Sequence, residues 1–196
     1  VARENGIGLL LAGDGGDEIF AGNERYIEQR RYDAWQKIPS PLRRMLIRPL
    51  LNAMASADGT SVLARARAYA DRASMPLPDR LQAYNLVATT ALEGLFHPDF
   101  LAALDPEGPL QLIREIYHRP ADATELKRMH FLDLHVTLAD NDLRKVNRAC
   151  ELAGVRVAYP MLDEDLVTLA AGIPSSTLLP EGRLRGFYKD AMGEFL

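Results

Sequence analysis

The sequence predicts a mainly α-helical chain with one buried strand near its N-terminus. Two observations favour this fold class. The apolar run Ile7–Ala12 ends in glycines, and the apolar residues further along recur at alternating spacings of three and four. No later segment alternates apolar and polar residues over the length of a strand, so the rest is expected to be helix and loop.

The first element is a strand over Ile7–Ala12. A continuous apolar run is typical of a strand buried on both faces of a parallel sheet. Because no second strand is recognisable, we expect its partner strands to lie outside this chain. The chain also begins without Met and ends inside a predicted helix, which indicates a piece of a longer protein.

Capping residues and prolines predict where the helices begin and end. The first begins after Gly16, with two acids in its first turn, and runs to about Arg31. Tyr32 and Trp35 follow it and are expected to pack in a core. Ser40 is predicted as an N-cap with Pro41 at the first helical position. Further helices are expected over 60–73, 78–92, 98–104, 129–153, 163–171 and 181–195, with Gly172 closing the one before last.

The segment 129–153 has the most regular pattern. Its apolar residues fall on one helical face and are interpreted as core packing, with Cys150 as a buried, inert thiol; they are Met129, Leu132, Val136, Ala139, Leu143, Val146, Cys150 and Ala153.

Composition limits the function classes. The 196 residues are 47% hydrophobic and 26% charged, as in a soluble globular protein of one domain or two small lobes. A net charge of -4 disfavours nucleic acid as a partner. No apolar run is long enough to span a membrane. The single cysteine cannot form an internal disulfide, which is compatible with the cytoplasm. The four histidines show no metal-ligand spacing.

The segment best suited to bind a ligand is the glycine-rich turn between the strand and the first helix. Glycines allow close approach of a ligand, and backbone N–H groups at a helix start can bind phosphate. The carboxylates of Asp17 and Glu18 would repel a bare phosphate but could hold Mg²⁺ between themselves and phosphate oxygens. From the residues alone, a plain turn with a capped helix remains the alternative.

The string GDGGDEIFAG, followed by Arg25 and Tyr26, resembles the asparagine synthetase signature S-G-(D/E)-G-(G/S)-D-E-(L/V)-F-G-G-Y. Residues 143–150 and 160–167 resemble the family's L-x-K-V-D-R-A-S and P-F-L-D-x-x-L-V segments. The resemblance covers roughly residues 5 to 30 and 138 to 196, and the middle of the chain matches no pattern. It implies that residues 1–196 are the helical part of an α/β, PP-loop pyrophosphatase-like synthetase domain, without the upstream S-G-G-x-D-S loop and glutaminase domain.

The resemblance also implies a reaction and its residues. The family uses ATP and Mg²⁺ to adenylate a small carboxylate, which ammonia from glutamine converts to an amide, and a homodimer is one arrangement it allows. The implied roles are nucleotide or pyrophosphate binding by Gly13, Gly15, Gly16 and Lys145, metal binding by Asp17 and Glu18, and catalysis by Asp14, Arg185 and Lys189.

Some positions depart from the family pattern. Ala12 replaces a serine, Arg156 and Ala158 replace a glutamate and an arginine, and Arg185 stands in a lysine position. These changes leave two alternatives open. The chain could belong to a non-catalytic helical module, or to a synthetase that makes a β-lactam or modifies a peptide or sugar. The tetrapeptide Gly15–Glu18 also spells the motif of diguanylate cyclases, but those place it in a β-hairpin.

Overall fold

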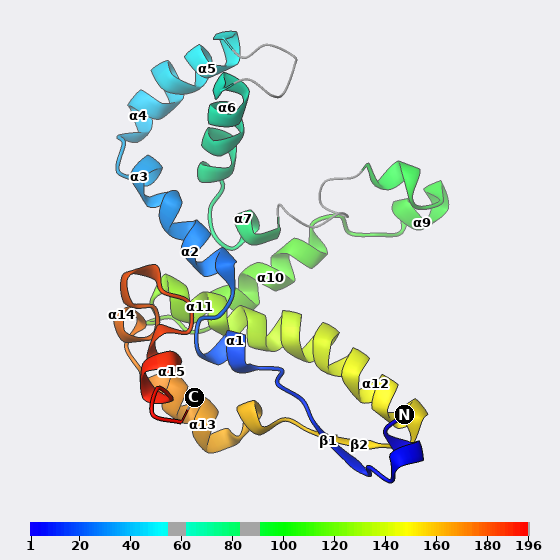
Figure 1. Cartoon of the computed structure of the whole chain (residues 1–196). Coiled ribbons are helices and arrows are strands. Elements are labelled where there is room, and N and C mark those ends of the chain that lie inside the picture. The colour runs from blue at the N-terminus through cyan, green and yellow to red at the C-terminus, as the bar shows by residue number, and fades with distance from the viewer. Residues whose placement is uncertain (55–61, 83–90, 196) are drawn as a thin grey trace. The chain divides into compact units, whose positions relative to one another are not determined.

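A computed structural model describes residues 1–54, 62–82 and 91–195. The chain divides into two compact units, one of residues 1–27 and 115–196 and the other of residues 28–114. Most of the described chain is helical, and it contains a small two-stranded parallel sheet (Figure 1). The mainly helical prediction is therefore confirmed.

The sheet of the first unit pairs two strands from distant parts of the sequence. Strand β1 (Leu9–Leu11) lies parallel to β2 (Arg156–Ala158), with Leu9 opposite Arg156. The expectation that the partner of β1 lies outside the chain is therefore wrong. The expected burial on both faces is also wrong within this chain, because Leu11 is 71% exposed. Both strands of a two-stranded sheet are edges, so neither is enclosed.

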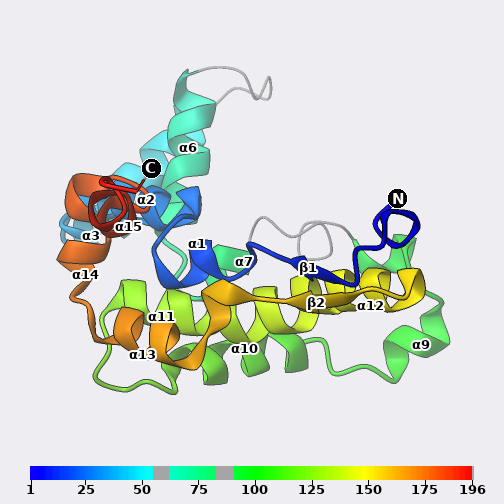
Figure 2. The same cartoon turned by 60° about the horizontal axis from the view of Figure 1, so that its bottom comes forward.

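One long helix runs beside this sheet (Figures 1 and 2). It consists of α11 (Glu125–Leu132), η4 (Asp133–Asp142), which has π-helical hydrogen bonding, and α12 (Leu143–Ala153). Thr124 caps its start by accepting a hydrogen bond from the N–H of Lys127. Gly154, at φ 64°, ends it. The predicted helix is confirmed, with a start four residues earlier.

The apolar stripe on this helix is only partly core. Met129 and Leu132 are buried, whereas Ala139 and Ala153 are exposed. Cys150 is half-buried, so its predicted burial is wrong. The apolar stripe is therefore buried at its start, in α11, and partly exposed to solvent along η4 and α12.

The glycine-rich segment forms two helices where one was predicted. Helix α1 (Gly16–Ile19) ends at a sharp break, and α2 (Glu24–Arg31) follows and crosses into the second unit. The break occurs because Ala21 adopts a left-handed conformation, with φ 55°, which an α-helix cannot contain.

The C-terminal part of the first unit consists of short helices. Asp163 caps α13 (Glu164–Gly172) by accepting from the N–H of Asp165, which confirms that predicted helix. The long helix predicted over 181–195 is wrong, because Arg185 has φ 52° and interrupts it. The other short helices of this unit are η1 (Arg3–Asn5), η5 (Pro160–Leu162), α14 (Ser175–Leu178), η6 (Pro180–Gly182) and α15 (Gly186–Ala191).

The second unit has its own core. Tyr32 and Trp35 pack with Ala70 and Ala73, which confirms the predicted packing role of the two aromatic residues. The predicted cap at Ser40 is wrong, because Ser40 is already the first helical residue and Pro39 takes the N-cap position. Among its described residues, this unit contains the helices α3 (Asp33–Gln36), α4 (Ser40–Leu42), η2 (Arg43–Ile47), α5 (Arg48–Met54), α6 (Val62–Ala73), α7 (Asp79–Gln82), η3 (Leu92–Gly94) and α9 (Pro98–Ala102).

Helix α6 confirms the prediction for 60–73 from residue 62 onwards, and α9 confirms the one for 98–104. Of the helix predicted over 78–92, residues 83–90 lie outside the described part. Helix α10 (Gly108–His118), which was not predicted, spans the boundary between the units. Within the described residues, no helix is both long enough and apolar enough to cross a membrane.

Candidate functional site

The glycine-rich loop connects β1 to α1 and needs two of its glycines for different reasons. Gly15 has φ 94°, and a Cβ atom there would lie 2.1 Å from Cδ2 of Leu162. At Gly13, no atom of the described residues lies within 4 Å of the place that a Cβ atom would take, so open space borders the loop. The residues after Gly15 form α1 rather than a hairpin turn, which opposes the diguanylate cyclase interpretation.

An ion pair joins this loop to the C-terminal part of the same unit. Nε of Arg185 donates a hydrogen bond to Oδ1 of Asp17 over 2.6 Å, although the two residues lie 168 positions apart. This bond raises the pKa of the Arg185 guanidinium above its usual value. Gly22 makes room for the pair, because a Cβ atom there would lie 2.0 Å from the same carboxylate oxygen.

The pair borders a cavity of about 300 Å³. Aromatic contacts support its wall, since the rings of Phe20 and Tyr188 lie 5.1 Å apart. Asp17 and Arg185 are each 43% exposed, so a ligand can reach both. The complete lining is Gly13, Gly16, Asp17, Phe20, Met161, Arg185 and Tyr188. The structure thus brings together four of the residues that the sequence singles out: Gly13, Gly16, Asp17 and Arg185.

The other predicted site residues do not line this cavity. Glu18 is buried and lines a different cavity on the other side of α1. Asp14 is half-buried and lies near Tyr159, where desolvation raises the pKa of the phenol and the charge of Asp14 adds to the effect. Lys189 is exposed on α15. Lys145 is exposed on α12, where its Nζ forms an ion pair with Asp142 over 2.8 Å.

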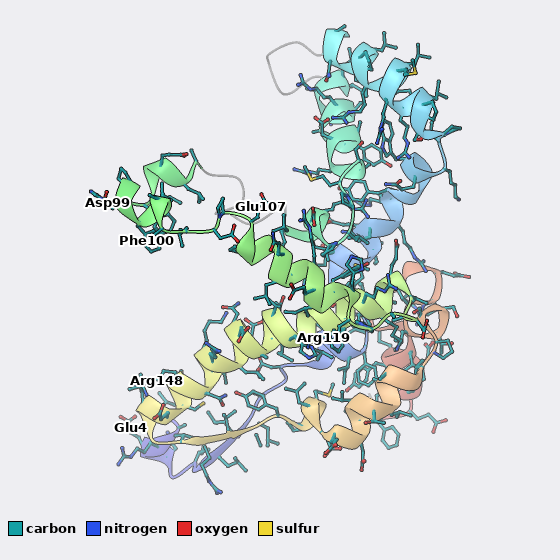
Figure 3. All side chains as sticks on the ribbon, turned by 180° about the vertical axis from the view of Figure 1, so that it is seen from behind. Glu4, Asp99, Phe100, Glu107, Arg119 and Arg148 are labelled. Carbon is teal, nitrogen blue, oxygen red and sulfur yellow. The ribbon has the colours of Figure 1, made fainter. Side chains whose placement is uncertain are left out.

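The basic residue Arg148, near Lys145, also faces away from the loop. Its Nη1 pairs with Glu151 over 2.6 Å on the exposed surface of α12. Figure 3 shows Arg148 towards the end of this helix that lies beside η1, which carries Glu4. The neighbouring Arg3 confirms that proximity, since its Nη1 lies 3.3 Å from the place that a Cβ atom would take at Gly154. The structure therefore separates these cations of α12 from the cavity.

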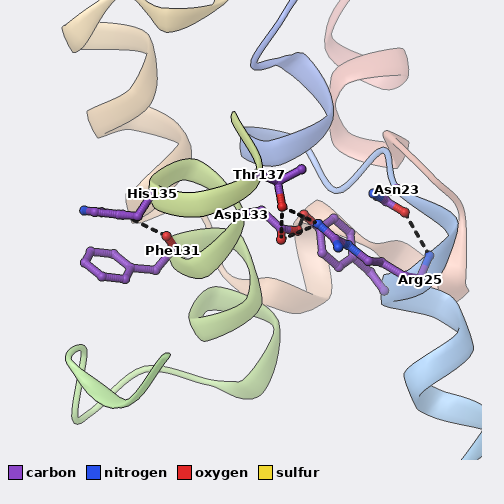
Figure 4. A network of polar contacts seen from close by, with 7 residues as sticks. Asn23, Arg25, Phe131, Asp133, His135 and Thr137 are labelled. Atoms are coloured by element: carbon purple, nitrogen blue, oxygen red, sulfur yellow. Dashed lines mark hydrogen bonds and ion pairs between the residues drawn. The ribbon is translucent and has the colours of Figure 1, made fainter. Parts of the chain in front are cut away.

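A buried polar network joins α2 to η4 and was not recognised in the sequence (Figure 4). Asp133 is 2% exposed and accepts a hydrogen bond of 2.5 Å from the Tyr26 hydroxyl. It also pairs with Arg25, whose guanidinium donates to Thr137. Burial raises the pKa of the Asp133 carboxyl, which Arg25 and Tyr26 counteract. The sequence did contain a sign of this network, because Asp133 is an acid on the apolar helical face that carries Met129.

The fit of a magnesium ion can be judged from the carboxylates. Asp17 supplies one partly exposed carboxylate at the cavity, and Mg²⁺ commonly binds to one or two carboxylates together with phosphate oxygens. Glu18 does not share this cavity. Among residues 1–54, 62–82 and 91–195, no three His, Cys, Asp or Glu side chains gather as a metal site. The residues therefore fit an ion whose other ligands come from a bound phosphate.

Comparison with known proteins identifies the family. The chain is 22% identical over 184 residues to an asparagine synthetase [glutamine-hydrolyzing] 1 of Bacillus subtilis, covering 93% of this chain and 27% of that protein. It is 26% identical to putative asparagine synthetases [glutamine-hydrolyzing] of Mycobacterium bovis and Mycobacterium tuberculosis, covering 89% of this chain and 26% of each. No solved structure matches it significantly.

The chain thus spans about a quarter of the length of these curated relatives. The family model described as asparagine synthase matches residues 1–196, which is the whole chain. The matched region includes the glycine-rich loop, the long helix and the segment that carries Arg185. The chain belongs to the asparagine synthase family.

Proposed function

We propose that the full-length protein containing this chain is an ATP-dependent ligase that forms an amide from a small carboxylate and ammonia derived from glutamine. One observation carries the proposal. The loop residue Gly13, the carboxylate of Asp17 and the guanidinium of Arg185 meet at one partly exposed cavity. The names of the relatives support the same reaction class, and a PP-loop pyrophosphatase-like fold for the whole domain is part of the proposal.

In the proposed reaction, a carboxylate oxygen attacks the α-phosphorus of ATP and pyrophosphate leaves. Ammonia then attacks the acyl carbon of the adenylate, and AMP leaves as the amide forms. Gly13 would allow the phosphates to approach the backbone. Arg185 would stabilise negative charge on phosphate, which a fixed cation does well in a confined site. Asp17 would hold Mg²⁺, which neutralises phosphate charge when bound.

The decisive substitution is Gly13→Ala. Because no atom of the described residues lies within 4 Å of the added methyl group, we expect the thermal stability to be unchanged. We also expect the KM for ATP to rise about tenfold or more, since the methyl group would lie where the phosphates approach. Pyrophosphate release would be measured with Mg²⁺ and ATP across a panel of amino-acid and sugar carboxylates, with glutamine or ammonia present. A normal KM for ATP in this variant would contradict the phosphate-binding role of the loop.

Arg185 and its neighbour Arg183 offer a matched pair. Both lie in the same short segment, but Arg183 pairs with Asp190 and does not line the cavity. We expect Arg185→Gln to lower kcat about 100-fold, as for loss of one charge-stabilising group, and Arg183→Gln to have little effect. Lys189→Gln tests the alternative cation. If Lys189→Gln lowered kcat as much as Arg185→Gln, the catalytic role would move to α15.

A non-catalytic module is the second candidate, and the hydrogen bond between Asp17 and Arg185 favours it. Each charge of the proposed site already has a partner within the protein. This candidate predicts no ATP binding and no pyrophosphate release with any carboxylate. A titration of the full-length protein with ATP and Mg²⁺ separates the two, because the ligase requires binding that Asp17→Ala weakens.

A further inference from the structure

A second cavity lies on the opposite side of α1 from the proposed ATP site. It has a volume of about 470 Å³ and is bounded by α1, α11, η4, α13 and the turns at 120–124 and 172–175. This volume is within the range of small-molecule sites. Much of its wall is apolar, from residues such as Ile19, Phe131, Leu134 and Val167. Glu18 and His130, both almost fully buried, are polar exceptions.

One ring nitrogen of His130, Nε2, is buried without a hydrogen bond to the described residues. The residue is 5% exposed, and its Nε2 has no hydrogen-bond partner among the described residues. A buried polar atom without a partner costs free energy, so such an atom at a cavity points to a ligand. Burial and the charge of Lys127 lower the pKa of the imidazole to about 3, so it is neutral and one ring nitrogen is an acceptor.

Glu18 gives the cavity its electrostatic preference. The residue is 9% exposed, and it lines the cavity together with a second acid, Asp122. The neighbouring charges that act on it are those of Asp17, Asp133 and Asp142, all of them acids. Lys127 also lines the cavity, but its Nζ donates to the carbonyl oxygen of Ala170 over 2.8 Å. A cation beside Glu18 would relieve this accumulation of negative charge.

From these features we infer that the cavity binds a small primary amine with an apolar body. The ammonium group would lie beside Glu18 and donate a hydrogen bond to Nε2 of His130. The apolar body would contact Ile19, Phe131 and Val167. The inference goes beyond the proposed ligase reaction, because this cavity shares no lining residue with the one that contains Asp17 and Arg185.

The test uses three probes with the same ring and different polar groups: 2-phenylethylamine, 2-phenylethanol and phenylacetate. Each would be titrated calorimetrically into the full-length protein at neutral pH without ATP, so the result does not depend on turnover. We expect the amine to bind at least about tenfold more tightly than the alcohol, since a charge-assisted hydrogen bond adds more than about 1.4 kcal/mol. Phenylacetate should bind most weakly, because Glu18 repels it.

Variants locate the site. His130→Phe and Glu18→Gln should each weaken amine binding about tenfold, while His97→Gln should leave it unchanged. His97 is likewise a histidine, but it is exposed and lies outside the cavity lining. Val167→Trp places a large side chain in the cavity lining and should abolish binding, with thermal denaturation verifying that each variant folds.

Three outcomes would overturn the inference. The first is no binding of the amine, and the second is equal or tighter binding of the alcohol or phenylacetate. The third is amine binding that persists unchanged in folded His130→Phe and Val167→Trp.

Discussion

Burial of His130 couples the protonation of one residue to folding. Its pKa is about 3 in the folded protein and about 6.5 when exposed. Between these values the unfolded chain binds one more proton than the folded chain, so the unfolding free energy falls as pH decreases, by up to about 1.4 kcal/mol per pH unit. We expect His130→Phe to lose less stability than the parent between pH 6 and pH 4, measured by urea unfolding. Glu18 and Asp133 titrate in both proteins, so they cancel in the comparison, and parallel curves would contradict the assignment.

At the scale of elements, the break between α1 and α2 depends on one strained residue. Ala21 is fully buried and has φ 55°, a conformation that costs an L-residue about 1 kcal/mol or more. Glycine adopts it freely, so Ala21→Gly should stabilise the protein by roughly 0.5 to 1 kcal/mol in urea unfolding. Ala149→Gly provides the control, since Ala149 is exposed within α12 and the same change should destabilise by about 1 kcal/mol. Destabilisation by both substitutions would show that Ala21 is not strained.

At the scale of the whole molecule, the two-stranded sheet leaves apolar side chains exposed. Leu9 is 45% exposed and Leu11 is 71% exposed, and unpaired apolar strand edges promote association. We expect the 196-residue chain to self-associate at about 10 to 100 μM in sedimentation velocity experiments, and Leu11→Lys to reduce this. Leu112→Lys alters an equally apolar exposed side chain on α10, outside the sheet, and should have no effect. A monomeric parent, or equal effects of both substitutions, would contradict the role of the sheet edge.

The sequence predicted the features that depend on local pattern and missed those that depend on distant partners. The strand at β1 was recognisable from its apolar run. In contrast, β2 is a short strand whose identity depends on pairing with residues near the N-terminus. The left-handed residues Ala21 and Arg185 carry side chains that usually avoid this conformation, so the helix breaks there were not foreseeable.

The site, too, was predictable only in part. The resemblance to the family's motifs identified Gly13, Asp17 and Arg185, which the structure brings to one cavity. The separation of Asp17 from Glu18 could have been foreseen, because adjacent helical residues point about 100° apart. The hydrogen-bond partners of Asp133 and the surroundings of Nε2 of His130 could not, since both result from packing between elements.

The hydrogen bond between Asp17 and Arg185 implies cooperative ion exchange at this surface. A cation that takes the place of Arg185 at Oδ1 of Asp17 releases the guanidinium, and the released Arg185 then needs an anion. A cation and an anion should therefore increase each other's affinity by the same factor, because such coupling is reciprocal. Either ion alone would have to break the internal pair without compensation, whereas a metal and a phosphate that arrive as one complex would exchange partners with both residues at once.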